Sequence, residues 1–171
     1  MSSSDKNLSD FGNKEIPDAS EMNFGIVCAE WNESITAALY QGCFDTLIKH
    51  GAQTHKIHSI WVPGTFELPV GAKMLAQTLK LDAVICLGCV IKGETSHNEY
   101  INMSVANALQ QMSVVSGKPF IFGVLTPNDM QQAMDRAGGI HGNKGDEAAV
   151  TAIKMAALRK SLSEPEKKIG F

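Results

Sequence analysis

The densest group of reactive side chains lies just after a long apolar run in the middle of the chain. Ser96 and Glu99 have the spacing of a capping box, so we expect a helix to begin near His97. Gly93 and Thr95 would then lie just before a helix N-terminus, where free N–H groups and the helix dipole favour an anion such as phosphate. His97 is suited to proton transfer, because only histidine titrates near neutral pH without perturbation. The pattern predicts an anion site beside a proton shuttle, and an ordinary capped helix with a structural histidine is the alternative.

A second segment, residues 135–145, combines four glycines with two cationic side chains. The glycines predict a bent connection between two helices, with Asn143 as the N-cap of the second helix. Such a density of glycine indicates a close approach of the backbone to something else. Arg136 could bind a phosphate with its guanidinium fork, and Lys144 could supply a point charge. A solvated hinge is the alternative that composition leaves open.

The four cysteines are predicted to be core residues. Cys86 and Cys89 match the C-x-x-C spacing of a redox dithiol or of half a zinc site. They lie, however, inside the apolar run 83–91, which is typical of a buried strand, where positions i and i+3 point to opposite faces. No second pair exists to complete four zinc ligands, and His55 and His58 lack the i, i+4 helical spacing of a metal-binding pair. We therefore expect no metal site.

The apolar pattern predicts the scaffold that positions these segments. Four apolar runs are candidate strands, residues 24–29, 57–62, 83–91 and 120–125, and the last two are nearly unbroken, as in a parallel sheet covered on both faces. The segments between them carry helical spacing. The predicted core stripes are Ile35, Leu39, Cys43 and Leu47; Ile101, Val105, Ala108, Met112 and Val115; and Val150, Ile153 and Ala157.

Alternation of strands and helices predicts an α/β protein: a three-layer αβα sandwich around a central parallel four-stranded sheet, flavodoxin-like, in a single domain. We place that domain at residues 22–162, between a flexible N-terminal arm (1–21) and a polar C-terminal tail (163–171). Gly51 and Gly117 are placed to end helices, and Gly170 is either a third such residue or part of the tail. Ligands of open α/β sheets bind at the carboxyl ends of the strands, so we expect the site there.

Composition excludes several classes of function. A net charge of -3 and a pI near 5.9 give no electrostatic reason to expect nucleic-acid binding. No run approaches the roughly 18 apolar residues of a membrane span, and the polar first twenty residues contain no signal-peptide core, so we expect a cytoplasmic protein. The usual glycine-rich nucleotide motifs are also absent.

Three motifs in the same order and spacing resemble the lumazine synthase family of riboflavin biosynthesis. They are VPGTFE at residues 62–67, LGCVIKGETSH at 87–97, and RAG at 136–138 followed by GNKG at 142–145. The resemblance runs from about Phe24 to Arg159. It implies a transferase that condenses 5-amino-6-(D-ribitylamino)uracil with 3,4-dihydroxy-2-butanone 4-phosphate. The products would be 6,7-dimethyl-8-ribityllumazine, phosphate and water, and no cofactor or metal would be needed.

The same resemblance implies a role for each motif residue. His97 would transfer protons, and Arg136 would hold the phosphate together with Gly93, Thr95 and the backbone of Glu94, whose carboxylate would turn outward. Trp31 would stack on the pyrimidine ring, as an aromatic face suits a flat heterocycle. The other implied substrate-binding residues are Asn32, Gly64, Thr65, Phe66, Glu67, Cys89, Val90, Ile91, Phe122, Lys144 and Glu147. Two positions depart from the family pattern, since Ile140 replaces a common lysine and Cys89 a common threonine.

The resemblance further implies pentamers in which Phe122, Arg136 and Lys144 come from the neighbouring subunit. The short connection at 138–143 goes with a hollow icosahedral shell of twelve pentamers in this family, and riboflavin synthase is a candidate partner. A different class of function is an assembly-competent but catalytically weak shell or flavin-binding paralogue, which predicts damage at Trp31, His97 or Arg136 that the sequence does not show. A flavodoxin-like binding domain would need a Ser/Thr-rich phosphate loop after the first strand, where this chain has Trp31 and Asn32.

Overall fold

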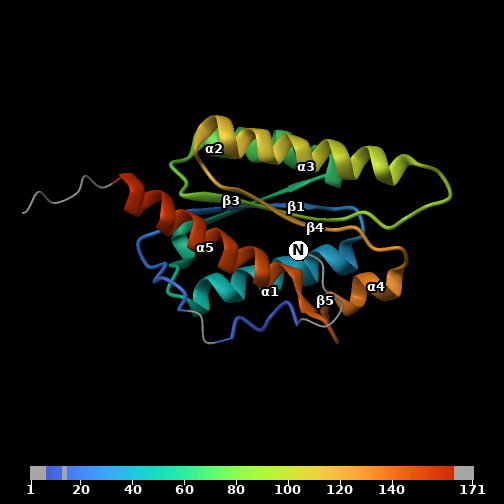
Figure 1. Cartoon of the computed structure of the whole chain (residues 1–171), viewed down its shortest axis with the longest axis horizontal. Helices are drawn as coiled ribbons and strands as arrows, with labels where there is room; N and C mark the ends of the chain where they lie inside the picture. The colour runs from blue at the N-terminus through green and yellow to red at the C-terminus, as the bar shows by residue number, and fades with distance from the viewer. Residues whose placement is uncertain (1–6, 13–14, 164–171) are drawn as a thin grey trace, which may run out of the picture.

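The central sheet contains four parallel strands in the order β2-β1-β3-β4 (Figure 1). The computed structural model describes residues 7–12 and 15–163. The strands are β1 (Phe24–Ala29), β2 (Ile57–Val62), β3 (Ala83–Cys89) and β4 (Phe120–Leu125). All four predicted strands are confirmed, although β3 ends two residues earlier than predicted. The chain beyond Cys89 stays extended, with the N–H of Val90 donating to the carbonyl of Leu125 at 2.9 Å.

Helices cover both faces of this sheet, which confirms the three-layer α/β sandwich (Figure 1). Helices α1 (Glu33–Lys49) and α5 (Lys144–Ser163) lie on one face, and α2 (Leu68–Thr78) and α3 (His97–Ser116) lie on the other. The predicted stripe of α1 is entirely buried. In α5, Val150 and Ile153 are buried and Ala157 is half-buried. No helix in the described part of the chain is long and apolar enough to cross a membrane.

The stripe predicted for α3 is wrong at its C-terminal end. Val105 and Leu109 are the buried positions of this helix, whereas Val115 is 87% exposed. At 100° per residue, Val115 lies roughly 100° around the helix from the midpoint of Val105 and Leu109. Its side chain therefore points away from the sheet. The alternating spacing of four and three residues in the sequence did not predict this exposure.

The two cysteines of the C-x-x-C motif lie on opposite faces of β3, as predicted. Cys86 packs in the cluster beneath α2 and α3, and Cys89 packs in the cluster beneath α1 and α5. All four cysteines are free and buried. Burial raises the pKa of Cys28 to about 12 and that of Cys89 to about 11, and it raises the thiol pKa of Cys43 and Cys86 as well. These thiols are packing residues and not nucleophiles.

The glycine-rich connection forms a small antiparallel hairpin, β5 (Ala137–Gly139) and β6 (Gly142–Asn143), after a short helix α4 (Met130–Asp135). The hairpin was not predicted, whereas α4 and α5 are the two helices between which a bent connection was expected. Gly142 has a φ of +79°, a left-handed conformation that favours glycine at the turn. Asn143 is the predicted N-cap of α5, and its Oδ1 accepts a hydrogen bond from the N–H of Gly145 at 2.7 Å.

The close backbone approach predicted for this glycine-rich segment is a helix contact. A Cβ added to Gly145 would overlap the carbonyl oxygen of Leu39 in α1. The same packing presses α1 against Asn143, because a Cβ at Gly42 would meet its side chain. The glycines thus allow α1 and α5 to pack tightly on their shared face of the sheet.

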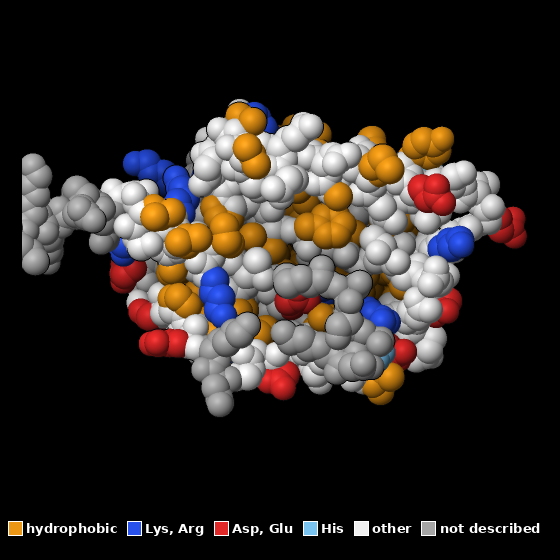
Figure 2. All heavy atoms as spheres, in the orientation of Figure 1, with side chains coloured by type: hydrophobic (Ala, Val, Ile, Leu, Met, Phe, Trp, Pro, Cys, Tyr) orange, Lys and Arg blue, Asp and Glu red, His pale blue; other side chains and the backbone are white. Residues whose placement is uncertain are grey.

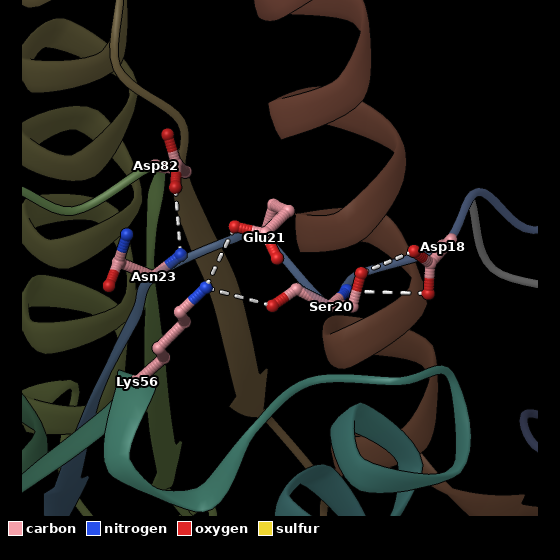
Figure 3. A network of polar contacts seen from close by, with 6 residues as sticks. All are labelled: Asp18, Ser20, Glu21, Asn23, Lys56 and Asp82. Carbon is pink, nitrogen blue, oxygen red and sulfur yellow. Dashed lines mark hydrogen bonds and ion pairs between the residues drawn. The ribbon is translucent and has the colours of Figure 1, made fainter.

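The amino-terminal ends of the strands are tied to the segment that precedes β1 (Figure 3). Lys56 Nζ donates to the Ser20 carbonyl at 3.0 Å and pairs with the Glu21 carboxylate at 3.1 Å. The N–H of Asn23 donates to the Asp82 carboxylate at 2.7 Å, and the Asn23 carbonyl accepts from the Asp82 N–H at 2.8 Å. This end of the sheet is therefore closed by structural contacts.

The arm at 1–21, the domain at 22–162 and the tail at 163–171 stay predictions, and Gly170 lies outside the described residues.

Candidate active site

A cavity of about 710 Å³ opens at the carboxyl ends of β1, β2 and β3. In the sheet order β2-β1-β3-β4, the chain passes from β1 to its neighbour on one side, β2, and then crosses to its neighbour on the other side, β3. Open α/β sheets bind ligands at such a switch point, here between β1 and β3. The cavity collects predicted site residues from three separate segments of the chain. They are Trp31, Asn32, Gly64, Thr65, Phe66, Glu67, Cys89, Val90, Ile91, Gly93, Thr95 and His97.

Asn32 connects the ends of β1 and β3 beneath this cavity. Its backbone is left-handed, with φ 61° and ψ 45°, and it is the one residue other than glycine with positive φ in the described chain. Its Nδ2 donates to the Cys89 carbonyl at 2.9 Å. Its own carbonyl accepts from the N–H groups of Ile35 and Thr36 in the first turn of α1. Asparagine tolerates this conformation better than most residues, and the strain is stored at the site.

Three aromatic side chains that line the cavity are exposed, Trp31 at 71%, Phe66 at 56% and Tyr100 at 76%. The backbone N–H of Trp31 donates to the Pro63 carbonyl at 3.2 Å, which ties the chain after β1 to the chain after β2. Exposed aromatic faces inside a cavity suit a flat ring that stacks on them.

The turn after β2 supplies the polar groups of the cavity wall. This turn is the short 3-10 helix η2 (Thr65–Glu67), in which the Glu67 N–H donates to the Gly64 carbonyl at 3.2 Å. The Thr65 Oγ1 is buried and has no hydrogen-bond partner within the chain. It lies over Gly88, where an added Cβ would come within 2.7 Å of it. The exposed carboxylate of Glu67 is thus available to a hydroxylated ligand, whereas the Thr65 hydroxyl is enclosed against Gly88.

The far wall of the cavity is the start of α3. This helix begins at His97, as predicted, with Ser96 at its N-cap position. The predicted capping box is wrong in one respect, because the Ser96 side chain makes no capping hydrogen bond. The first turn closes through the N–H of Glu99, which donates to the Ser96 carbonyl at 3.0 Å. Gly93, Thr95 and His97 are exposed here, where helix-start N–H groups have no helical partner.

Sequence reasoning missed four residues of the cavity, and five of its predicted site residues, of which Glu94 is the nearest in sequence, do not line it. Pro63, Asn98, Tyr100 and Ile101 line it, whereas Glu94 is exposed and does not. Tyr100 and Ile101 follow His97 by three and four positions, so they share its face of α3. The predicted start of the helix was the signal that would have identified them.

The other predicted residues lie away from the cavity. Phe122, Lys144 and Glu147 line a groove of about 1140 Å³ between α3, β4 and α5, where Figure 2 shows hydrophobic side chains gathered in the band between the two helices. Lys144 Nζ pairs with Glu147 at 3.0 Å. Arg136 lines neither hollow, and its Nη1 donates to the Gln132 carbonyl at 3.1 Å. Among the residues that the structure describes, no lysine or arginine lines the cavity itself.

A metal centre finds no support in the described part of the chain. No group of three or more His, Cys, Asp or Glu side chains there could hold a metal ion. The reactive groups that line the cavity are an imidazole, a carboxylate, hydroxyls and aromatic rings. Such a set can stack a flat ring, bind hydroxyl groups and transfer protons.

Comparison with known proteins identifies relatives over nearly the whole chain. The family model of 6,7-dimethyl-8-ribityllumazine synthase matches residues 21–160. The protein of that name from Cytophaga hutchinsonii is 55% identical over 157 residues, which cover 92% of this chain and 98% of the relative. The corresponding protein from Parabacteroides distasonis is 54% identical over 155 residues, covering 91% and 97%. That from Flavobacterium johnsoniae is 48% identical over 167 residues, covering 96% and 88%.

Proposed function

Because the chain belongs to the 6,7-dimethyl-8-ribityllumazine synthase family, we propose that the cavity at the carboxyl edge of its sheet is the place where the lumazine is made. The protein is a transferase of riboflavin biosynthesis that acts on small molecules. Its substrates are 5-amino-6-(D-ribitylamino)uracil and 3,4-dihydroxy-2-butanone 4-phosphate. The observation that carries the proposal is that one cavity gathers twelve predicted site residues from three chain segments far apart in sequence, residues 31–32, 64–67 and 89–97.

The cavity offers complementary groups to each part of the pyrimidine substrate. Trp31 stacks on the uracil ring, which is flat and fits the exposed indole face. Asn32, Thr65 and Glu67 bind the ribityl chain, and the exposed Glu67 carboxylate accepts hydrogen bonds from its hydroxyl groups. Gly64, Phe66, Cys89, Val90 and Ile91 shape the pocket around these contacts.

The phosphate of the second substrate binds at the start of α3. Gly93 and Thr95 lie directly before the helix, where free N–H groups and the helix dipole favour an anion. Glu94 contributes its backbone, since its carboxylate does not line the cavity and so does not repel the phosphate. Arg136 supplies the guanidinium fork.

His97 moves the protons of the reaction. The amine of the pyrimidine attacks the ketone and water leaves, the phosphate is then eliminated, and the ribitylamino nitrogen closes the second ring on the remaining carbonyl with loss of a second water. Each of these steps transfers a proton, and a positioned shuttle is typically worth about 10²–10⁴-fold. Holding the two substrates together in one cavity contributes much of the remaining rate.

The absence of any lysine or arginine from the lining of the cavity supports a shared site. A dianionic phosphate and a uracil carbonyl call for cations, and the predicted cations Arg136 and Lys144 lie on another surface of the same chain. We propose a pentamer in which the neighbouring subunit brings Phe122, Arg136, Lys144 and Glu147 to each cavity. The groove between α3 and α5 is large and apolar enough to form such a contact.

Three finer proposals concern the setting of the enzyme. The short hairpin of β5 and β6, which has no inserted segment, favours a shell of twelve pentamers. Riboflavin synthase, which would consume the product, is the proposed partner. Buried free thiols suit the reducing cytoplasm, which is the proposed location.

Formation of the fluorescent lumazine from the two substrates tests the reaction and the site together. We expect His97→Ala to lower kcat by about 10²-fold. We expect Arg136→Ala to lower kcat/KM for the phosphate substrate about 10- to 100-fold, as for lost hydrogen bonds to a charged group. His55→Ala, at an exposed position of the opposite end of the sheet, is the matched control and should be neutral. No turnover by the assembled wild-type protein would favour the shell or flavin-binding alternative.

Mixing the two weak variants tests the sharing of the site. After joint dissociation and reassembly, about a quarter of the sites in a random mixture combine an intact His97 with an intact Arg136 from the neighbour. Recovery of activity to that level supports the shared site. A mixture that is no more active than its components would place both residues in one subunit.

A further inference from the structure

Residues 7–9 lie against the β5–β6 hairpin, which is flanked by the two cationic site residues Arg136 and Lys144; Figure 1 shows the position of this hairpin beneath α1 and α5. The Leu8 N–H donates to the His141 carbonyl at 2.7 Å. The Ser9 Oγ accepts a hydrogen bond from the N–H of Asn143 at 2.9 Å. A Cβ added to Gly142 would overlap Asn7 and come within 2.8 Å of both the N and the Oγ of Ser9. Residues 7–9 thus cover the turn of the hairpin closely.

Two short paths lead from this contact to the cationic residues. Asn143 directly precedes Lys144, and the Lys144 N–H donates to the Arg136 carbonyl at 2.9 Å. In the turn itself, the His141 N–H donates to the Asp135 carbonyl at 2.8 Å, next to Arg136. The hydrogen bonds of residues 7–9 therefore end at Asn143, which precedes Lys144, and at His141, which is one further hydrogen bond from the neighbour of Arg136.

Asn143 is held from three directions, which makes it sensitive to the loss of any one of them. Its Nδ2 donates to the Ala38 carbonyl of α1 at 2.9 Å, and its Oδ1 caps α5. Its side chain is only slightly exposed, at 9%. The third contact is the one from its backbone N–H to Ser9, and it alone reaches the start of the chain.

We propose that Ser9 is a positioning residue for the reaction: its hydroxyl fixes the β5–β6 hairpin and through it the placement of Arg136 and Lys144. The proposal rests on the proposed function, because those two residues matter to catalysis only if they bind substrate. Asn7 supports Ser9 through its Oδ1, which accepts from the Ser9 N–H at 2.8 Å. The start of the chain is then part of the substrate-binding apparatus and not only a tether.

Steady-state kinetics of full-length Ser9→Ala test the proposal. We expect KM for the phosphate substrate to rise about three- to tenfold with little change in kcat, the effect of one lost hydrogen bond. Ser9→Thr, which keeps the hydroxyl, should restore the wild-type KM, and Asn7→Ala should give a smaller rise. Ser161→Ala, a matched serine at the far end of α5, should leave the kinetics unchanged.

The outcomes separate this proposal from the proposed function. If wild-type protein makes no lumazine, the proposed function fails. If wild-type protein is active and Ser9→Ala keeps its KM, the positioning role is wrong. A Ser9→Ala protein that unfolds at a lower temperature but retains its KM would show a purely structural contact, and a defect that Ser9→Thr does not restore would also refute the proposal.

Discussion

At position 32 we expect a glycine variant to be more stable than an alanine variant, the reverse of the order usual in a helix. The left-handed backbone of Asn32 favours glycine, and its side chain donates to the Cys89 carbonyl at 2.9 Å. Both Asn32→Ala and Asn32→Gly remove this hydrogen bond, at a cost of about 1 kcal/mol in free energy of unfolding. Alanine adds roughly 1–2 kcal/mol, because its Cβ is strained in the left-handed region. We therefore expect the alanine variant to lose about 2–3 kcal/mol and the glycine variant about 1 kcal/mol.

Urea unfolding measures this order, provided that all variants are compared at one protein concentration, since assembly stabilises by mass action. Gln111→Ala and Gln111→Gly are the matched controls, at an exposed position inside α3. In a helix interior alanine is more stable than glycine by about 1 kcal/mol, so the control pair should show the reverse order. If alanine at position 32 equals or exceeds glycine in stability, the left-handed conformation does not carry the strain assigned to it.

Two further predictions concern packing and the buried thiols. Gly145→Ala should lower the free energy of unfolding by about 1–3 kcal/mol, because the added Cβ meets the rigid Leu39 carbonyl. Gly93→Ala is the control, because a Cβ added there meets no other atom. Equal stability of the two variants in urea would contradict the tight α1–α5 contact. Burial raises the pKa of the Cys28 and Cys89 thiols to about 12 and 11, so the native protein at pH 8 should react with a thiol reagent far more slowly than the unfolded chain. Since the folded state holds these thiols protonated, stability should fall as pH rises above about 8.5, and rapid native labelling of Cys89 would refute this account.

Local pattern was sufficient for the elements of the scaffold. Apolar runs of strand length, bounded by polar residues, predicted the positions of all four strands, because the central strands β1 and β3 are buried on both faces and the edge strands β2 and β4 are buried in part. The start of α3 at His97 and the cap of α5 at Asn143 were predictable because helix ends need local hydrogen-bond partners. The placement of Cys86 and Cys89 on opposite faces of β3 was predictable from the two-residue period of a strand.

What the sequence by itself determined is therefore the set of elements and the edge of the sheet at which chemistry occurs. The tertiary structure decided which side chains share the cavity: it added Asn98 and Tyr100, and it placed Arg136 and Lys144 elsewhere on the chain. It also decided the contact of Ser9 with Asn143, across 134 positions of sequence. The physical reason is that periodicity and capping depend on neighbours along the chain. Cavities and long-range hydrogen bonds depend instead on how the finished layers pack, which no local pattern specifies.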